Sequence, residues 1–117
     1  MIAIFGESKA GEFNKLFSIK TLPDLATHLG EPTETGVAIH MAIQALLCKQ
    51  QLLFYKVREE GGHSDQYLPG FKLIKTAITA IALPGVSSPT LLESAKRLAP
   101  LLILTEQDLY DFMTQSP

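Results

Sequence analysis

A chain of 117 residues is close to the commonest length of a single domain, so a second independent core is not expected. Hydrophobic residues make up 46% of it and charged residues 19%, which excludes a disordered, highly charged chain. The net charge is −2 and the ten basic residues form no run longer than two, which argues against nucleic acid as a partner, because phosphate binding needs several cations on one face.

Short apolar runs and helix caps predict the elements of the first part of the chain. Residues 2–5 are rich in β-branched and aromatic side chains and predict a first strand. Residues 16–19 are a short apolar stretch in a polar loop that could form an edge strand, and they are not counted among the elements below. Thr21 is expected to cap a helix that Gly30 ends, with Asp24 in the capping-box position. The side chains at helical spacing that should form its apolar face are Leu22, Leu25, Ala26 and Leu29.

The middle of the chain predicts one long apolar helix and a second strand. Residues 37–50 carry few polar side chains, so most of this helix should be covered by protein. We therefore expect His40 to be partly buried and hydrogen-bonded, and Cys48 to be buried. Residues 52–57 predict a strand, and the polar, glycine-containing residues 58–69 predict a mobile surface loop.

The remainder of the chain predicts two more strands and two more helices. Residues 77–83 are almost continuously apolar, which is typical of a strand covered on both faces. Ser88 before a proline predicts the N-cap of a helix whose buried side chains should be Leu91, Leu92, Ala95, Leu98 and Ala99. Residues 101–104 predict a last strand, and Thr105 with Asp108 predicts a capping box before a final helix.

The order of these elements, β-α-α-β-β-α-β-α, indicates the fold class. A strand, a crossover helix and another apolar strand form a parallel pair with right-handed connection, and one such unit occurs in each half of the chain. We therefore predict a single α/β domain over residues 1–117. It should contain an open, mainly parallel sheet of about four strands with helices on both faces.

Residues 6–11 follow the first strand, where a phosphate-binding loop would lie. Such a loop needs Lys and then Ser or Thr after its last glycine, whereas Glu12 follows Gly11. The dinucleotide fingerprint also fails, because Ser8 stands where its second glycine is required. We therefore interpret these residues as an ordinary strand-exit loop.

The other reactive side chains lack the spacing typical of a catalytic or metal site. His28, His40 and His63 are far apart, and no cysteine near them completes a metal-ligand pattern. Ser87 and Ser88 lack the glycines of a nucleophile elbow, so helix capping explains them more simply. The sequence thus predicts no catalytic, cofactor-binding or metal-binding residue, and no bound cofactor.

An open parallel sheet still offers one place for a ligand, beyond the carboxyl ends of its strands. The segments expected there are residues 6–11, 58–62, 84–88 and 105–107. A small-molecule or nucleotide-binding α/β domain is therefore the alternative function that the sequence leaves open.

The cysteine content and the apolar runs bear on localisation. A single cysteine, Cys48, permits no intrachain disulfide and favours a reducing compartment. The longest apolar stretch, residues 37–48, is well short of the roughly 20 residues that a membrane helix needs. We expect a cytoplasmic protein, or one assembled in a virion or injection particle, without membrane contact.

Several segments of the chain follow the order found in one family of assembly proteins. They include a first strand ending in glycine, a helix followed by an apolar strand, and a later apolar strand ending in Pro-Gly. The segments concerned are residues 4–15, 19–25, 29–30, 45–47, 53–58 and 78–89. Taken together they resemble the tail-sheath proteins of contractile bacteriophages and of related contractile injection systems.

This resemblance implies a non-enzymatic structural protein of a phage, a prophage or a contractile injection system. Its partners would be further copies of itself or tail-tube and sheath components. Glu12 and Leu16 stand where the family usually has proline, and Gln50-Gln51 where it has a glycine pair. Family subunits carry terminal arms that add strands to their neighbours, and the resemblance implies a core domain without these arms.

Overall fold

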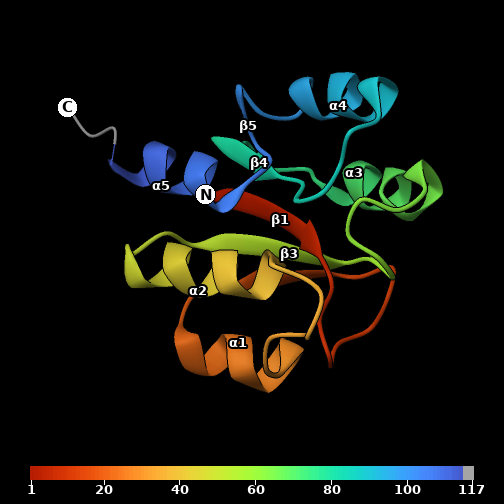
Figure 1. Cartoon of the computed structure of the whole chain (residues 1–117). Coiled ribbons are helices and arrows are strands. Elements are labelled where there is room, and N and C mark those ends of the chain that lie inside the picture. The colour runs from red at the N-terminus through yellow and green to blue at the C-terminus, as the bar shows by residue number, and fades with distance from the viewer. Residues whose placement is uncertain (115–117) are drawn as a thin grey trace.

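The computed structural model describes residues 1–114 as a five-stranded sheet with helices on both faces (Figure 1). The strands are β1 (Ile2–Gly6), β2 (Leu16–Ile19), β3 (Leu52–Lys56), β4 (Ala80–Ala82) and β5 (Leu101–Ile103). The helices are α1 (Leu22–Leu29), α2 (Ala38–Leu47), the 3-10 turn η1 (Ser64–Gln66), α3 (Leu68–Leu73), α4 (Pro89–Lys96) and α5 (Glu106–Thr114). None of the helices in this range is long and apolar enough to cross a bilayer. The predicted α/β class is confirmed.

The sheet is mixed but mainly parallel. Its strands follow the spatial order β2-β3-β1-β4-β5. β1, β3, β4 and β5 are parallel, and β2 is antiparallel to β3. Both predicted crossover units are present, because α1 and α2 connect β1 to β3 while α4 connects β4 to β5. The two connections lie on opposite faces, so the carboxyl ends of β1 and β4 form the switch point at which such sheets bind ligands.

Each face of the sheet has its own core, because alternate residues of a strand point to opposite faces. In β1, Ile2 and Ile4 pack with the side chains of α1, α2 and α5, whereas Ala3 and Phe5 pack with those of α3 and α4. All four side chains are fully buried, which is why this strand is continuously apolar. The aromatic rings around Phe5 in the second core are Tyr55, Tyr67 and Phe71.

The predicted helix caps are confirmed. The Thr21 hydroxyl oxygen accepts a hydrogen bond from the Asp24 N–H at 3.2 Å, which satisfies a free donor in the first turn of α1. Thr105 and Asp108 form a reciprocal capping box at α5, with distances of 3.1 Å in both directions. The Ser88 hydroxyl accepts the N–H three residues later at 3.4 Å, which caps α4.

The prediction of a mobile surface loop over residues 58–69 was wrong in its second half, where η1 and the start of α3 lie. Pro69 and Gly70 give this segment a poor helix propensity. A Cβ atom at Gly70 would lie 2.6 Å from the Phe5 ring and 2.8 Å from the Tyr55 ring. The glycine therefore lets α3 pack directly on the aromatic core, and this tertiary contact forms a helix that the local pattern does not indicate.

Two further predictions were only partly correct. The strand predicted over residues 77–83 is confined to β4, where three residues pair with β1 and with β5. In α1, Leu25 and Leu29 are buried as predicted, but Leu22 and Ala26 are exposed. This helix covers β2 at the rim of the sheet, so only a narrow part of its surface reaches the core.

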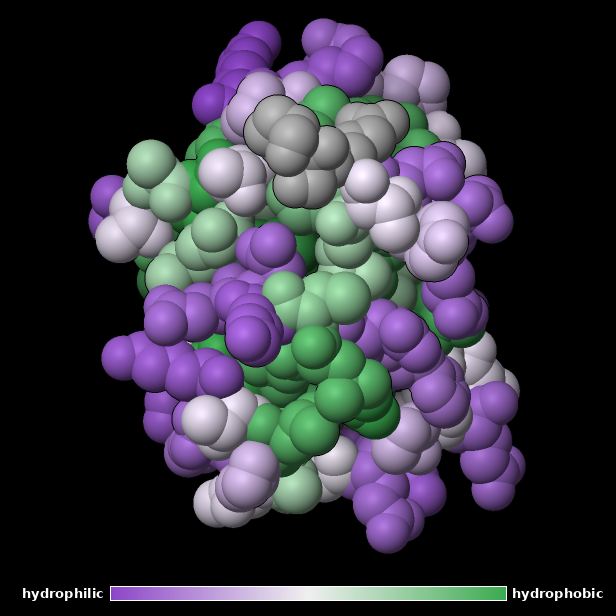
Figure 2. All heavy atoms as spheres, turned by 90° about the vertical axis from the view of Figure 1, so that its left-hand side faces the viewer, coloured by the Kyte–Doolittle hydropathy of each residue, from purple (hydrophilic) through white to green (hydrophobic). Residues whose placement is uncertain are grey.

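The predicted burial of His40 and Cys48 was wrong, because both side chains are exposed. The buried residues of α2 recur every three or four positions, as from Ala38 to Ala45, and this period turns His40 and Leu47 to the solvent. Cys48 follows the last helical residue. At this end of the molecule, hydrophobic side chains gather over the start of α1 and the end of α2 (Figure 2).

Candidate functional site

Three of the four segments predicted at the carboxyl edge of the sheet lie together. Residues 6–11, 58–62 and 84–88 follow the neighbouring strands β1, β3 and β4. The fourth segment, residues 105–107, follows β5 at the end of the sheet and begins α5. The residues through which the first three segments touch are Glu7, Glu60, Gly61 and Gly85.

Glu7 and Glu60 form a reciprocal pair of hydrogen bonds, which we call the carboxylate clasp. The Oε2 atom of Glu60 accepts the N–H of Glu7 at 2.9 Å, and Oε2 of Glu7 accepts the N–H of Glu60 at 3.0 Å. The second oxygen of Glu7 accepts the Thr35 hydroxyl at 2.9 Å. Hydrogen bonds to an ionised acceptor are stronger than neutral ones. The clasp therefore ties together the exits of β1 and β3.

Glu60 also caps the N-terminus of α2. Its two carboxylate oxygens accept the N–H groups of Val37 at 2.8 Å and of Ala38 at 3.2 Å. The helix has no side-chain cap of its own and no acidic residue in its first turn, so a carboxylate 22 residues beyond Ala38 supplies the negative charge that a helix N-terminus favours. The anion-binding position beside the switch point is thus occupied by the protein's own carboxylate.

Two glycines make room for this arrangement. A Cβ atom at Gly36 would collide with the Glu60 carboxylate. Gly61 has a φ of 81°, and a Cβ atom there would collide with the Gly85 carbonyl. Any other residue at Gly61 would meet both the steric cost of this backbone conformation and that collision. The turn after Glu60 is therefore fitted closely against the loop that follows β4.

The Tyr67 side chain is hydrogen-bonded to the turn that follows Glu60. Its hydroxyl oxygen accepts the Gly61 N–H at 2.9 Å, and its side chain is fully buried. Burial raises the pKa of the Tyr67 phenol, and the negative charges of Glu60, Glu7 and Glu59 raise it further, against an opposing effect of the Gly61 hydrogen bond. The phenol is neutral around pH 7 and acts as a hydrogen-bond partner.

The serines near this edge have structural contacts. Ser8 is buried, and its hydroxyl donates to the carbonyl of Ala10 at 2.6 Å. The loop over residues 6–11 leads into β2, so it is not followed directly by a helix as a phosphate-binding loop is. Ser88 caps α4, which confirms its predicted role, and Ser87 is exposed.

The three histidines lie apart from one another. His28 packs its ring against Phe17 at a centroid distance of 5.7 Å, and His40 is on the exposed side of α2. The Nδ1 atom of His63 accepts the Asp65 N–H at 3.1 Å, which caps η1. Over residues 1–114, no three His, Cys, Asp or Glu side chains are grouped so that they could hold a metal ion.

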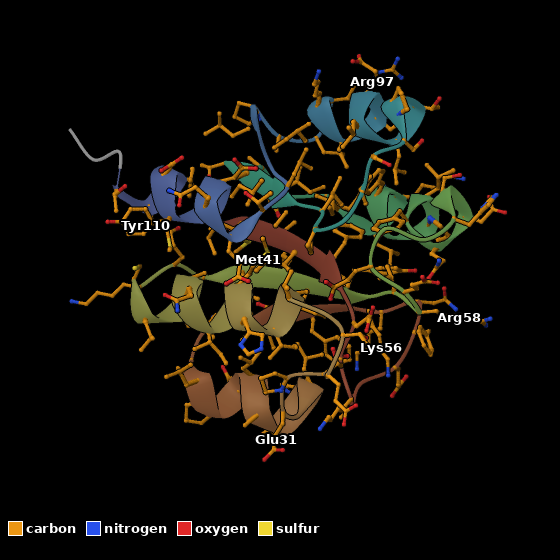
Figure 3. The ribbon with its side chains drawn as sticks, viewed as in Figure 1. Glu31, Met41, Lys56, Arg58, Arg97 and Tyr110 are labelled. Carbon is orange, nitrogen blue, oxygen red and sulfur yellow. The ribbon has the colours of Figure 1, made fainter. Side chains whose placement is uncertain are left out.

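A shallow pocket that sequence reasoning missed lies beside the end of β3. We call it the Phe13 pocket; it has a volume of about 270 Å³, and its lining includes Phe13, Asn14, Tyr55, Lys56, Arg58 and Gln66. The Lys56 ammonium lies 4.7 Å, and the Arg58 guanidinium 5.7 Å, from the centre of the Phe13 ring. Lys56 and Arg58 lie on the same side of the molecule (Figure 3). Only the long-range approach of Phe13 to β3 creates this site, so no local motif reveals it.

Comparison with known proteins adds no family to these observations. No family model, no curated protein and no solved structure matches the chain. The function is therefore argued from the residues and surfaces of this molecule.

Proposed function

We propose that the chain is a non-enzymatic structural protein that packs with other protein subunits, similar to the core of a tail-sheath subunit from a phage or a contractile injection system. It would work in the cytoplasm or within the assembled particle. Its partners would be other copies of the chain or tail-tube and sheath components. The order of sequence segments described above motivates the family, and one feature of the surface supports the assembly role.

That feature is the free edge of β5. This strand is the last of the sheet and pairs with β4 alone within residues 1–114. No charged residue occurs from 98 to 105, and Leu101 is 47% exposed. A groove of about 130 Å³ runs beside the strand, lined by Leu101, Leu102, Ile103, Asp108, Asp111 and Phe112. Uncharged, apolar edge strands are templates for pairing with another chain, which supports a packing role for this edge.

The carboxyl edge of the sheet supports the same proposal. Ligands of open α/β sheets usually bind beyond the carboxyl ends of the strands. In this molecule Glu60 occupies the anion-binding position, and Gly61 packs closely against Gly85. A ligand at the switch point between β1 and β4 would have to displace several hydrogen bonds of the chain itself.

The proposal is tested by sedimentation velocity and negative-stain microscopy of the concentrated protein, alone and mixed with tail-tube components. We expect particles larger than a monomer, or a complex with the tube components.

Leu101→Lys places a charge on the free edge of β5 and should weaken strand pairing there. Leu22→Lys is the matched control, because Leu22 is 40% exposed on α1 and lies away from β5. A protein that is strictly monomeric and binds none of the components contradicts the proposal.

The Phe13 pocket supports a second candidate, a small-molecule or nucleotide-binding domain. Two cations beside an exposed aromatic ring form a surface suited to an anionic, planar ligand. A thermal-shift screen against nucleotides tests it, with Arg58→Ala as the variant that should remove any stabilisation. A flat response across the panel would rule this candidate out.

A further inference from the structure

An apolar groove with a positively charged rim lies between α3 and α4, on the face of the sheet opposite α5. The α3–α4 groove has a volume of about 320 Å³ and is lined by Leu68, Phe71, Lys72, Ser94, Arg97 and Leu98. Leu68 is 38% exposed, although it is a large hydrophobic residue. The groove therefore offers apolar surface that a partner can cover.

The part of the chain that forms this groove is basic, although the whole protein has a net charge of −2. From residue 66 to residue 104 the chain has one acidic residue, Glu93, against four basic residues: Lys72, Lys75, Lys96 and Arg97. Glu93 forms an ion pair with Lys96 at 3.3 Å. In the part of the chain that the structure describes, neither Lys72 nor Arg97, which line the groove, takes part in an ion pair. Two cations at the groove are thus available to an acidic partner.

The exposed face of α5 has the complementary character. Leu109 is buried in the core that α1, α2 and α5 form with the sheet, while Glu106, Tyr110 and Asp111 are exposed. Tyr110 is 60% exposed, and α5 contains three acidic residues and no basic one. This face, the acidic face of α5, presents an aromatic ring flanked by carboxylates. Aromatic side chains of this kind are common anchors at protein interfaces.

The two surfaces cannot meet within one molecule. α5 packs with α2 on one face of the sheet, whereas α3 and α4 cover the other face. Arg97 and Tyr110 accordingly lie on different sides of the molecule (Figure 3). A contact between these surfaces therefore requires two copies of the chain.

We propose that the acidic face of α5 docks into the α3–α4 groove of a second copy, with Tyr110 in the groove and Glu106 and Asp111 facing Lys72 and Arg97. This inference rests on the proposed assembly function and names the partner as the chain itself. Because the two surfaces lie on opposite faces of the sheet, two copies cannot make this contact twice with each other, so the contact is head-to-tail and its repetition produces a ring or an open chain rather than a closed dimer. Charge complementarity also makes the association weaker at high salt.

Charge reversal on each surface tests the contact directly. The groove variant is Lys72→Glu with Arg97→Glu, and the helix variant is Glu106→Lys with Asp111→Lys. All four residues lie on the surface, so both variants should fold, which thermal melting verifies. In sedimentation velocity, each variant alone should show a dissociation constant for self-association raised at least about tenfold, because like charges then face each other.

Mixing the two variants gives the deciding measurement. An acidic groove then meets a basic α5, and a basic groove meets an acidic α5, so an equimolar mixture should recover association to within about threefold of the unaltered protein. Tyr110→Ala should weaken association without changing the melting temperature. Failure of the mixture to recover, or an assembly that stops at a dimer, overturns the inference.

The same experiment separates this inference from the proposed function. If the reversed variants assemble normally and Leu101→Lys does not, the assembly role stands and the α5 contact is wrong. If the unaltered protein is monomeric but binds tail-tube components, the contact is again wrong while the function stands. A monomer that binds no component contradicts both.

Discussion

The carboxyl edge of the sheet and the free edge of β5 differ in how their backbone groups are satisfied. At the carboxyl edge, Glu60 accepts three N–H groups from two distant segments, and Gly61 fits against Gly85. Within residues 1–114, β5 pairs with β4 alone, and an exposed leucine and an open groove lie beside its unpaired edge. The switch point, where such sheets usually bind ligands, is therefore closed by internal contacts, while the free edge of β5 is uncovered within residues 1–114.

The largest expected effect at the carboxyl edge comes from removing the Glu60 carboxylate. Glu60→Ala leaves the N–H groups of Glu7, Val37 and Ala38 without their acceptor, and several charge-assisted hydrogen bonds are lost together. We expect the free energy of unfolding to fall by about 3 kcal/mol, measured by urea denaturation. Glu59→Ala is the control, because Glu59 is exposed and its removal should cost less than about 0.5 kcal/mol. Equal effects of the two variants would show that the clasp contributes nothing specific.

The fit of the turn after Glu60 is tested by comparing two glycines with a positive φ. Gly61→Ala introduces backbone strain and a collision with the Gly85 carbonyl, so we expect a loss of about 2–3 kcal/mol. Gly30 has a similar φ of 76°, but a Cβ atom there meets its nearest neighbour at 3.5 Å, an ordinary contact. Gly30→Ala should therefore cost about 1–2 kcal/mol for backbone strain alone, because a φ of 76° with a ψ of −157° is a conformation that is almost restricted to glycine. A similar loss at both positions would mean that the turn can move away from Gly85.

Tyr67→Phe tests the hydrogen bond beneath the same turn. At pH 7 the variant leaves the Gly61 N–H without its acceptor and should lose about 1 kcal/mol. The pKa of Tyr67 is raised in the folded protein by burial and then by nearby carboxylates, so the folded state holds this proton more tightly than the unfolded state does. The contribution to stability is complete below the ordinary tyrosine pKa of about 10 and is lost as the pH rises through the folded value.

Urea denaturation of both proteins from pH 7 to pH 11 checks this sign. The unaltered protein should lose more stability than Tyr67→Phe over the range above about pH 10, so the difference between them should shrink. A difference that stays constant would show that Tyr67 does not titrate differently in the two states.

The sequence predicted the elements with strong local signals and missed those that depend on distant contacts. Thr21, Ser88 and Thr105 form the predicted caps, because a cap needs only residues within three positions. α3 was missed because its glycine and proline favour a loop, and packing on Phe5 decides its form.

The carboxyl edge shows the same limit. The predicted parallel strands correctly placed residues 6–11, 58–62 and 84–88 at one edge of the sheet, because the carboxyl ends of parallel strands lie together. It gave no sign that Glu60 would cap α2, since these residues are 22 or more positions apart. The burial of Cys48 was predicted wrongly because its segment is apolar as a whole, whereas the helix period and the end of α2 decide which side chains are covered.

The smallest expected effect belongs to the free edge of β5 and completes the comparison of the two edges. Leu101→Lys should change the free energy of unfolding by less than about 0.5 kcal/mol, because the leucine is 47% exposed and the lysine stem can cover the same surface. Ile103→Lys, two residues along the strand, places the charge in the core and should cost more than about 3 kcal/mol, since Ile103 is 1% exposed. Both side chains point to the same face of the sheet, so denaturation of both variants compares the exposed start of the strand with its buried end. If Leu101→Lys is as costly as Ile103→Lys, Leu101 supports the fold itself, and the free edge of β5 is not available to a partner.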